Sequence, residues 1–196
     1  VADILYDLIM SFEERYVTNL LSPADAVRKA IALSKSETKP VVLSDVQDNS
    51  GGGATSDTTW ILSALVEQNA QDAALGLMYD PAAAEAAHAA GEGARIRLEL
   101  GGKLMPGHMP FVGEFTVKKL HAGPFIGYGP MIKGDTVDLG KMAHLSIGGV
   151  HVAVSSVRVQ MLDQSYFKVV GIEPTKLKII VVKSANHYRA DFQPIS

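Results

Sequence analysis

The spacing of apolar residues at the start of the chain is typical of an amphipathic helix. Apolar side chains at positions 4, 5, 8, 9 and 12 fall on one helical face, which predicts a helix over residues 2–12. Ser22 followed by Pro23 is a typical helix start, because serine caps the first turn and proline fits the first helical position. A second helix is therefore expected from Pro23 to about Leu33.

The next part of the chain alternates between short apolar runs and helical stretches. Apolar runs at 40–43 and 73–79 have the length of buried strands, and a helix is expected near 57–69. Asp80 precedes an alanine-rich helix predicted for residues 81–90. This β-loop-α-β-α order is typical of a parallel sheet covered by helices.

The pattern changes after Gly93. Strict alternation of apolar and polar side chains then becomes common, as in half-exposed strands, and the Gly148-Gly149 pair predicts a hairpin turn. Strands are expected at 95–100, 112–120, 136–138, 142–147, 150–154 and 156–161. We interpret this middle section as an antiparallel insertion or subdomain.

The end of the chain returns to an α/β pattern, with a short helix at 165–171, a buried strand at 178–182 and a polar strand-to-helix corner at 183–189. The predicted fold class is α/β, with a mixed sheet, flanking helices and an antiparallel β excursion in the middle of the chain. One domain spanning 1–196 is expected, with N-terminal helices at 1–35, an α/β part at 36–95, an antiparallel part at 96–163 and a closing α/β part at 164–196.

Composition narrows the class of protein. The 196 residues suffice for one well-buried core, and 47% apolar with 20% charged residues is typical of a globular domain. A net charge of −3 gives no support for nucleic-acid binding, and no apolar run is long enough to cross a membrane. The absence of cysteine excludes disulfides and thiolate chemistry and suits a cytoplasmic location.

A long polar loop, residues 44–59, separates the first predicted strand from the following helix. Gly51, Gly52 and Gly53 let its backbone adopt positive φ and approach a ligand closely, and the helix start beyond it offers a seat for an anion. The loop matches neither the Walker pattern nor the dinucleotide-binding pattern. It is therefore either a ligand-binding turn or a tight connection that binds nothing, although it is long for a plain connection.

Asp45, Asp48 and Asn49 are the polar side chains at the start of this loop. Two carboxylates three residues apart could bind a cation or act as acid and base. Asp and Asn in turns also accept hydrogen bonds from nearby backbone N–H groups. At least one of the three is expected to hold the loop in this way.

Two further polar clusters follow predicted strands. Residues 101–108 include Lys103, which is suited to an anionic substrate group, and His108; a solvated lysine and an unengaged histidine are the alternatives. Residues 183–189 emerge from a predicted central strand, where ligands of open α/β sheets gather. The side chains there that could bind a carboxylate or supply a proton are Lys183, Ser184, His187 and Arg189.

The common catalytic and metal-binding motifs are absent. No GxSxG elbow accompanies Ser184 and His187, so the pair alone does not indicate a nucleophile and its base. The six histidines, at positions 88, 108, 121, 144, 151 and 187, show neither HExxH nor HxH spacing. We expect no metal site in this chain.

The three polar clusters, taken in order, resemble the C-terminal domain of the microcystinase C-like (MlrC) family of metallopeptidases. The similarity extends over nearly the whole chain, as far as Pro194. The segments that carry it are 40–54, 98–103, 129–131 with Gly140, 158–160 and 181–189.

The resemblance implies a bacterial hydrolase of linearised microcystin or other small peptides. Its zinc would be held mainly by histidine and acidic residues of an N-terminal domain that precedes Val1, so this chain would hydrolyse nothing alone. Zinc-activated water would attack an amide carbonyl, and this domain would line the other wall of the cleft. The glycine loop would present N–H groups to a substrate carboxylate or to a developing oxyanion.

The resemblance and the clusters together assign the candidate residues. His187 and Lys183 are the catalytic candidates, and substrate- or anion-binding roles are expected for Asp48, Asn49, Gly51, Gly52, Gly53, Lys103 and Arg189. The expected partners are the N-terminal domain of the same protein and a small peptide, with a homo-oligomer left open. The alternative function is a non-catalytic anion-binding or dimerisation module whose loop only holds its ligand.

Overall fold

A computed structural model describes residues 1–16 and 19–196 of the chain. The strands are β1 (Val41–Ser44), β2 (Ala73–Tyr79), β3 (Arg95–Leu100), β4 (Phe111–His121), β5 (Phe125–Ile126), β6 (Thr136–Val137), β7 (Met142–Ile147), β8 (Val150–Ser155) and β9 (Ile179–Val182). The α-helices are α1 (Ala2–Met10), α2 (Pro23–Leu33), α3 (Trp60–Glu67), α4 (Pro81–Ala90), α5 (Ser165–Lys168) and α6 (Arg189–Phe192). Short 3₁₀ helices are η1 (Glu13–Tyr16), η2 (Val46–Asp48), η3 (Ser50–Gly52), η4 (Pro174–Lys176) and η5 (Gln193–Ile195).

The main sheet has seven strands in the order β1-β9-β2-β8-β7-β4-β3, and β5 pairs with β6 in a separate ribbon. Strands β1, β9, β2 and β8 are parallel, with Ile179 of β9 opposite both Val41 of β1 and Ala73 of β2. The last strand of the chain therefore lies between the first two. Because these strands are parallel, their carboxyl ends meet at one edge of the sheet, and that edge is where the polar clusters gather.

The antiparallel strands continue the same sheet. β8 pairs with β7, β7 with β4 and β4 with β3, all antiparallel. The predicted mixed sheet with an antiparallel excursion is thus confirmed, but the excursion extends the main sheet and does not form a subdomain of its own.

The strand predicted at 156–161 is wrong. β8 ends at Ser155, whose Oγ donates to the carbonyl oxygen of Val157 at 2.8 Å as the chain leaves the sheet. Apolar residues alternate with polar ones in this segment as they would in a strand. Both neighbouring positions beside β8 are taken by β2 and β7, so a strand that directly follows β8 has no place next to it.

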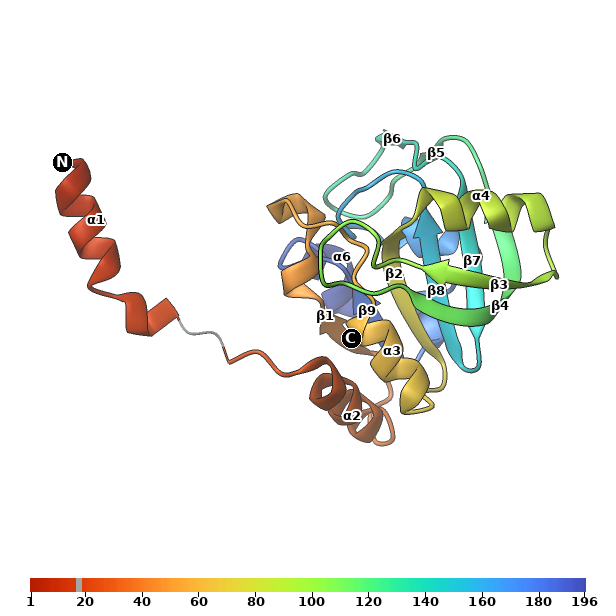
Figure 1. Cartoon of the computed structure of the whole chain (residues 1–196), viewed down its shortest axis with the longest axis horizontal. Helices are drawn as coiled ribbons and strands as arrows, with labels where there is room; N and C mark the ends of the chain where they lie inside the picture. The colour runs from red at the N-terminus through yellow and green to blue at the C-terminus, as the bar shows by residue number, and fades with distance from the viewer. Residues whose placement is uncertain (17–18) are drawn as a thin grey trace.

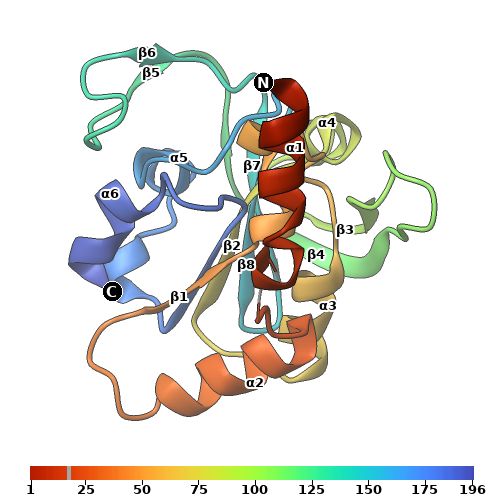
Figure 2. The ribbon, with the colours of Figure 1, turned by 90° about the vertical axis from the view of Figure 1, so that its left-hand side faces the viewer.

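Helices cover both faces of the sheet. One hydrophobic core joins α2, α3 and α4 to the sheet and includes Leu65, Leu75 and Phe115. A second core joins α5 and α6 to the opposite face and includes Phe167 and Phe192. Figure 2 shows α5 and α6 on one side of the strands and α3 and α4 on the other. The sheet is thus the middle of three layers.

The predicted helix starts are confirmed. The Ser22 hydroxyl accepts a hydrogen bond from the Asp25 N–H at 3.2 Å, and α2 ends at Leu33. The Asp80 carboxylate accepts one from the Ala83 N–H at 3.0 Å, and α4 ends at Ala90. Both caps satisfy N–H groups that a helix start otherwise leaves without partners.

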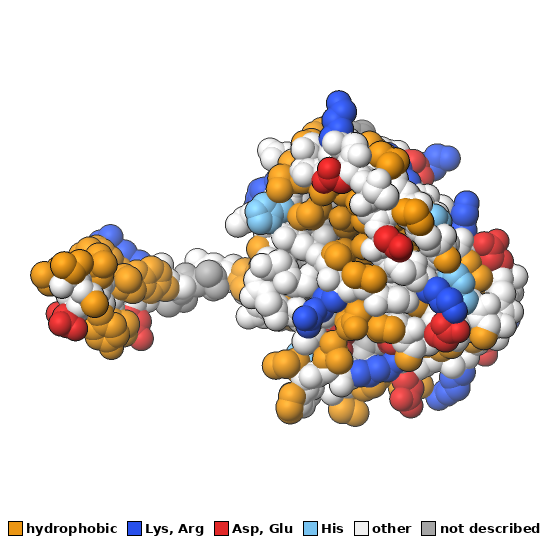
Figure 3. Space-filling model, turned by 90° about the horizontal axis from the view of Figure 1, so that it is seen from above, with side chains coloured by type: hydrophobic (Ala, Val, Ile, Leu, Met, Phe, Trp, Pro, Cys, Tyr) orange, Lys and Arg blue, Asp and Glu red, His pale blue; other side chains and the backbone are white. Residues whose placement is uncertain are grey.

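Helix α1 extends away from the rest of the protein (Figure 1). None of its residues is buried, and Ile4 and Leu8 are 71% and 53% exposed. In the space-filling view its apolar side chains form a separate lobe (Figure 3). Within the described residues, no helix combines the length and the apolar character needed to cross a membrane.

Packing at Gly76 in β2 gives a test of the second core. A Cβ at Gly76 would lie 2.8 Å from Cε1 of the fully buried Phe167, so Gly76→Ala should lower the free energy of unfolding by about 1–3 kcal/mol. Gly52→Ala is the matched control, because a Cβ there meets only Asn49 Nδ2, at 3.6 Å, and the change should stay within about 0.5 kcal/mol. Urea unfolding measures both. Equal losses in the two variants would contradict the packing described here.

Candidate functional site

The carboxyl ends of the parallel strands bring together groups that are far apart in the sequence. Asp45 follows β1, Asp80 follows β2 and Lys183 follows β9. The loop between β1 and α3 lies over the same edge, because it starts at Asp45 and its residue Asp48 contacts Lys183. The candidate site is therefore built on the strand order itself.

Lys183 is the centre of a buried ionic cluster. Its side chain is fully buried, and Nζ donates to Asp48 Oδ2 at 2.6 Å and to Asp45 Oδ2 at 3.1 Å. Nζ also donates to the Thr58 carbonyl oxygen at 2.9 Å. An ammonium in a protein interior needs such partners, because removing a charge from water is costly. Lys183 thus joins β9 to both ends of the loop.

Asp48 holds the loop in shape. Its Oδ1 accepts from the Ser56 N–H at 2.6 Å, and its Oδ2 accepts from the Thr58 N–H at 2.9 Å and from the Thr58 hydroxyl at 2.8 Å. Burial opposes ionisation of this carboxyl, but the charge of Lys183 and the hydrogen bonds from Lys183 and Thr58 outweigh it and lower its pKa. The expectation that an acidic side chain holds the loop is confirmed.

The glycines form an exposed 3₁₀ turn. The Gly51 N–H donates to Asn49 Oδ1 at 3.1 Å, the Gly52 N–H to the Asn49 carbonyl oxygen at 2.9 Å and the Gly53 N–H to the Ser50 carbonyl oxygen at 3.0 Å. Gly53 has φ of 94°, a left-handed conformation that favours glycine. The three glycine N–H groups therefore already have acceptors inside the loop, while the glycine surface stays open to solvent.

Gln160 connects this turn to the corner after β9. Its Nε2 donates to Ser184 Oγ at 2.7 Å, and its Oε1 lies 3.2 Å from Nδ1 of His187. A Cβ on Gly51 would clash with Gln160 Oε1, so a larger residue there would displace the Gln160 side chain from this position. His187 and Arg189 are exposed, and the Arg189 guanidinium lies 5.6 Å from the centre of the Tyr188 ring.

Lys103 belongs to a neighbouring cluster. Its Nζ donates to Asp80 Oδ2 at 2.7 Å, and Asp80 also accepts from the Gly101 N–H at 2.8 Å. Asp57 Oδ2 accepts from the Lys103 N–H at 2.8 Å, while the buried Asp57 Oδ1 has no hydrogen-bond partner among the described residues. The carboxylates at the ends of β2 and the loop thus fix the 101–104 segment in place.

The structure therefore divides the predicted residues into two sets. Asn49, the glycine turn, His187 and Arg189 lie at or beside an accessible surface, whereas Asp48 and Lys183 are buried in the framework and Lys103 is paired with Asp80. Sequence reasoning did not single out Gln160, Asp57 or Asp80 as part of the site. Asp80 was noted only as a helix start, and Gln160 only as part of a predicted strand and of the resembling segment 158–160. In residues 1–16 and 19–196, no group of three or more His, Cys, Asp or Glu side chains is placed to hold a metal ion.

Comparison with known proteins establishes the family. The profile described as MlrC C-terminus matches residues 43–196, which is most of the chain. The chain belongs to the MlrC C-terminus family. The resemblance noted in the sequence is thereby confirmed.

Two longer proteins are similar to this MlrC C-terminal chain. Microcystinase C of Sphingomonas sp. is 31% identical over 168 residues, which make up 83% of this chain and 32% of that protein. A solved structure from Mesorhizobium sp. BNC1, provisionally described as a metallopeptidase, is 27% identical with a TM-score of 0.85. The match covers 97% of this chain and 38% of that one, and it supports the same fold. The chain spans about a third of the length of both proteins.

The depressed pKa of Asp48 predicts how the stability of this MlrC C-terminal chain depends on pH. A carboxyl whose pKa is lower in the folded state contributes stability above its unfolded pKa of about 4, and that stability is lost as the pH falls through the folded pKa. Asp48→Asn should therefore be less stable than the parent at pH 7, and the difference should shrink below about pH 4. Urea unfolding from pH 7 to pH 3 measures it. A difference that does not change with pH would contradict the ionic role of Asp48.

Proposed function

We propose that this chain is the C-terminal domain of a zinc-dependent amide or peptide hydrolase and that its polar edge lines the active-site cleft. Support comes from the family match and from the similarity to Microcystinase C. The observation that carries the proposal is an accessible edge where Gln160 lies between a bare glycine turn and His187, with the exposed Arg189 two residues further along the chain. The proposed substrates are linearised microcystin-like or other small peptides.

Zinc, in this proposal, is held by residues outside this chain. The part of the chain that the structure describes contains no cluster suited to the ion, so we assign no step of metal chemistry to these residues. The relatives extend far beyond the matched region, which leaves room for a separate metal-binding domain. The role proposed for this chain is to bind and orient the substrate.

The exposed side chains at the edge carry the binding role. His187 is accessible, and Gln160 orients its ring through Nδ1. Arg189 provides a positive charge two residues away, which suits a substrate carboxylate or carbonyl oxygen. Since the glycine N–H groups already have acceptors within the loop, we assign the turn a steric role: without side chains it lets the substrate backbone approach closely. Lys183 and Asp48 keep the turn in position.

We further propose that the N-terminal domain of the same protein is the partner that covers α1. The helix exposes Ile4, Leu5, Leu8 and Ile9, each more than half accessible, and none of its residues is buried by the part of the chain that the structure describes. An apolar face of this kind is stabilised when another surface removes it from water. The longer relatives contain the additional chain that would supply that surface.

A comparison of the full-length protein with this chain alone tests the division of roles. The full-length protein should bind zinc in a one-to-one ratio and cleave small peptides, and its α1 amide hydrogens should exchange more slowly than in the isolated chain. Metal analysis, a peptidase assay and hydrogen-exchange mass spectrometry provide the three readouts. One-to-one zinc in the isolated chain would contradict the assignment of the metal ligands to the other domain. Activity in neither protein would favour the alternative, a non-catalytic ligand-binding or dimerisation module.

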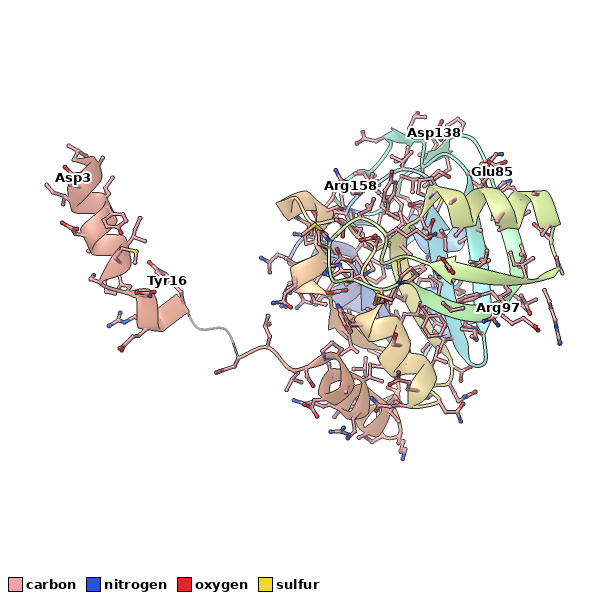
Figure 4. All side chains as sticks on the ribbon, in the orientation of Figure 1. Asp3, Tyr16, Glu85, Arg97, Asp138 and Arg158 are labelled. Carbon is pink, nitrogen blue, oxygen red and sulfur yellow. The ribbon has the colours of Figure 1, made fainter. Side chains whose placement is uncertain are left out.

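Substitutions at the edge test the cleft itself. In the full-length protein, His187→Ala and Arg189→Ala should each lower kcat/KM about tenfold or more, which corresponds to about 1.4 kcal/mol of lost transition-state stabilisation. Arg97→Ala is the control, because Arg97 lies on β3 at the other end of the sheet (Figure 4) and should leave kcat/KM unchanged. Unchanged kinetics in both edge variants would show that this edge does not face the substrate.

A further inference from the structure

A cavity of about 370 Å³ lies beside the ionic cluster. Its walls come from the segment that leads into α2, from the carboxyl end of β1 and from the first residues of α3. Residue 108, from the connection between β3 and β4, also lines it. The cavity is large enough for an amino-acid side chain, and no part of the proposed binding edge uses it.

The charges around the cavity are acidic. Asp45 and Asp48 line it, and none of its lining residues is a lysine or an arginine. Lys183 does not line the cavity, and of the four oxygen atoms of the two carboxylates it donates hydrogen bonds only to the Oδ2 atoms. Asp45 is 12% exposed, and its Oδ1 makes no hydrogen bond to any residue that the structure describes. Two carboxylates against one ammonium leave a net negative charge at the polar end.

The rest of the cavity suits an apolar stem. Leu20, Leu21, Leu43 and Ile61 are among its lining residues. Trp60 lines it as well and is 54% exposed, so its indole ring is available to a ligand. Tryptophan is the best aromatic partner for a cation, which lies over the face of the ring. The apolar walls, Trp60 and the acidic end therefore all suit a ligand with an apolar stem and a positive charge.

The start of α3 does not convert this cavity into an anion site. Helix starts attract anions through their free N–H groups and dipole. Here Asp45 and Asp48 line the cavity beside this helix start, and the Asp48 carboxylate accepts the N–H of Thr58, two residues before α3 begins. A ligand carboxylate in the cavity would lie close to the carboxylates of Asp45 and Asp48 and would be repelled by their negative charge.

His108 adds one further polar group. Its Nδ1 is buried and has no hydrogen-bond partner among the described residues. A buried polar atom without a partner costs free energy, so a ligand that offers a hydrogen bond there would be favoured. A guanidinium or ammonium head has several N–H donors, which Asp45 can accept together with His108 Nδ1 in the tautomer that carries its proton on Nε2.

From these contacts we infer that the cavity binds a group with an apolar stem and a cationic head, as in the side chains of lysine and arginine. In the hydrolase described above, it would be a subsite for a basic side chain of the peptide, and this last assignment rests on the proposed function. The binding preference itself does not.

Trp60 makes the test direct, because it is the only tryptophan in the chain. Its fluorescence is followed while the protein is titrated with hexylguanidinium, hexylammonium or hexanoate, three probes with the same stem. Both cations should give a saturable change, with dissociation constants at least tenfold lower than that of hexanoate. Hexanoate binding as tightly as the cations, or no saturable change with either cation, would overturn the inference.

Two variants locate the binding. Asp45→Asn should weaken binding of hexylguanidinium about tenfold or more, because it removes the charge next to the free oxygen. Ala26→Phe places a large side chain in the cavity from α2, changes no member of the ionic cluster and should abolish binding. Ala32→Phe, on an exposed position of the same helix outside the cavity, is the control and should bind as the parent does. Unchanged binding in Ala26→Phe would place the probe elsewhere and overturn the inference.

The outcome is separable from that of the proposed function. Binding needs no hydrolysis. If the chain binds hexylguanidinium but the full-length protein has no peptidase activity, the cavity inference stands and the proposed hydrolase function is contradicted. If the full-length protein is active but Trp60 fluorescence does not respond to the cations, the proposed hydrolase function stands and the cavity inference is contradicted.

Discussion

A single buried ammonium group organises the functional edge of this domain. Lys183 has no access to water, so its charge is tolerated only because Asp48, Asp45 and the Thr58 carbonyl oxygen surround it. Those partners come from β1 and from the loop before α3. The need to compensate one charge thus sets the position of the loop relative to the centre of the sheet. Removing Lys183 would leave the buried Asp48 carboxylate without its counter-charge.

This framework separates residues that hold the edge from residues that can reach a ligand. The ionic cluster lies beneath the surface, and Lys103 is held by its pairing with the buried Asp80. The glycine turn, His187 and Arg189 are open to solvent. Such a division suits a binding surface, because exposed side chains are useful only when their backbone is held in place. It also explains why the loop is polar and long and yet ordered around a few carboxylates.

Local signals in the sequence predicted much of the fold. The caps at Ser22 and Asp80, the apolar run of β2 and the fold class all agree with the structure. What local patterns could not give is the placement of β9 between β1 and β2, because pairing between strands more than a hundred residues apart leaves no trace in periodicity. The same long-range pairing decides that Lys183 is buried, although its sequence position suggested an accessible cation.

The functional edge as a whole depends on a rigid loop around Asp48. Native-state amide hydrogen exchange at Ser56 and Thr58, whose N–H groups both donate to this carboxylate, measures that rigidity most directly. Exchange that requires an opening free energy close to that of global unfolding is the predicted result. Fast exchange at both amides, as in a freely opening surface loop, would contradict the central role given to the buried cluster.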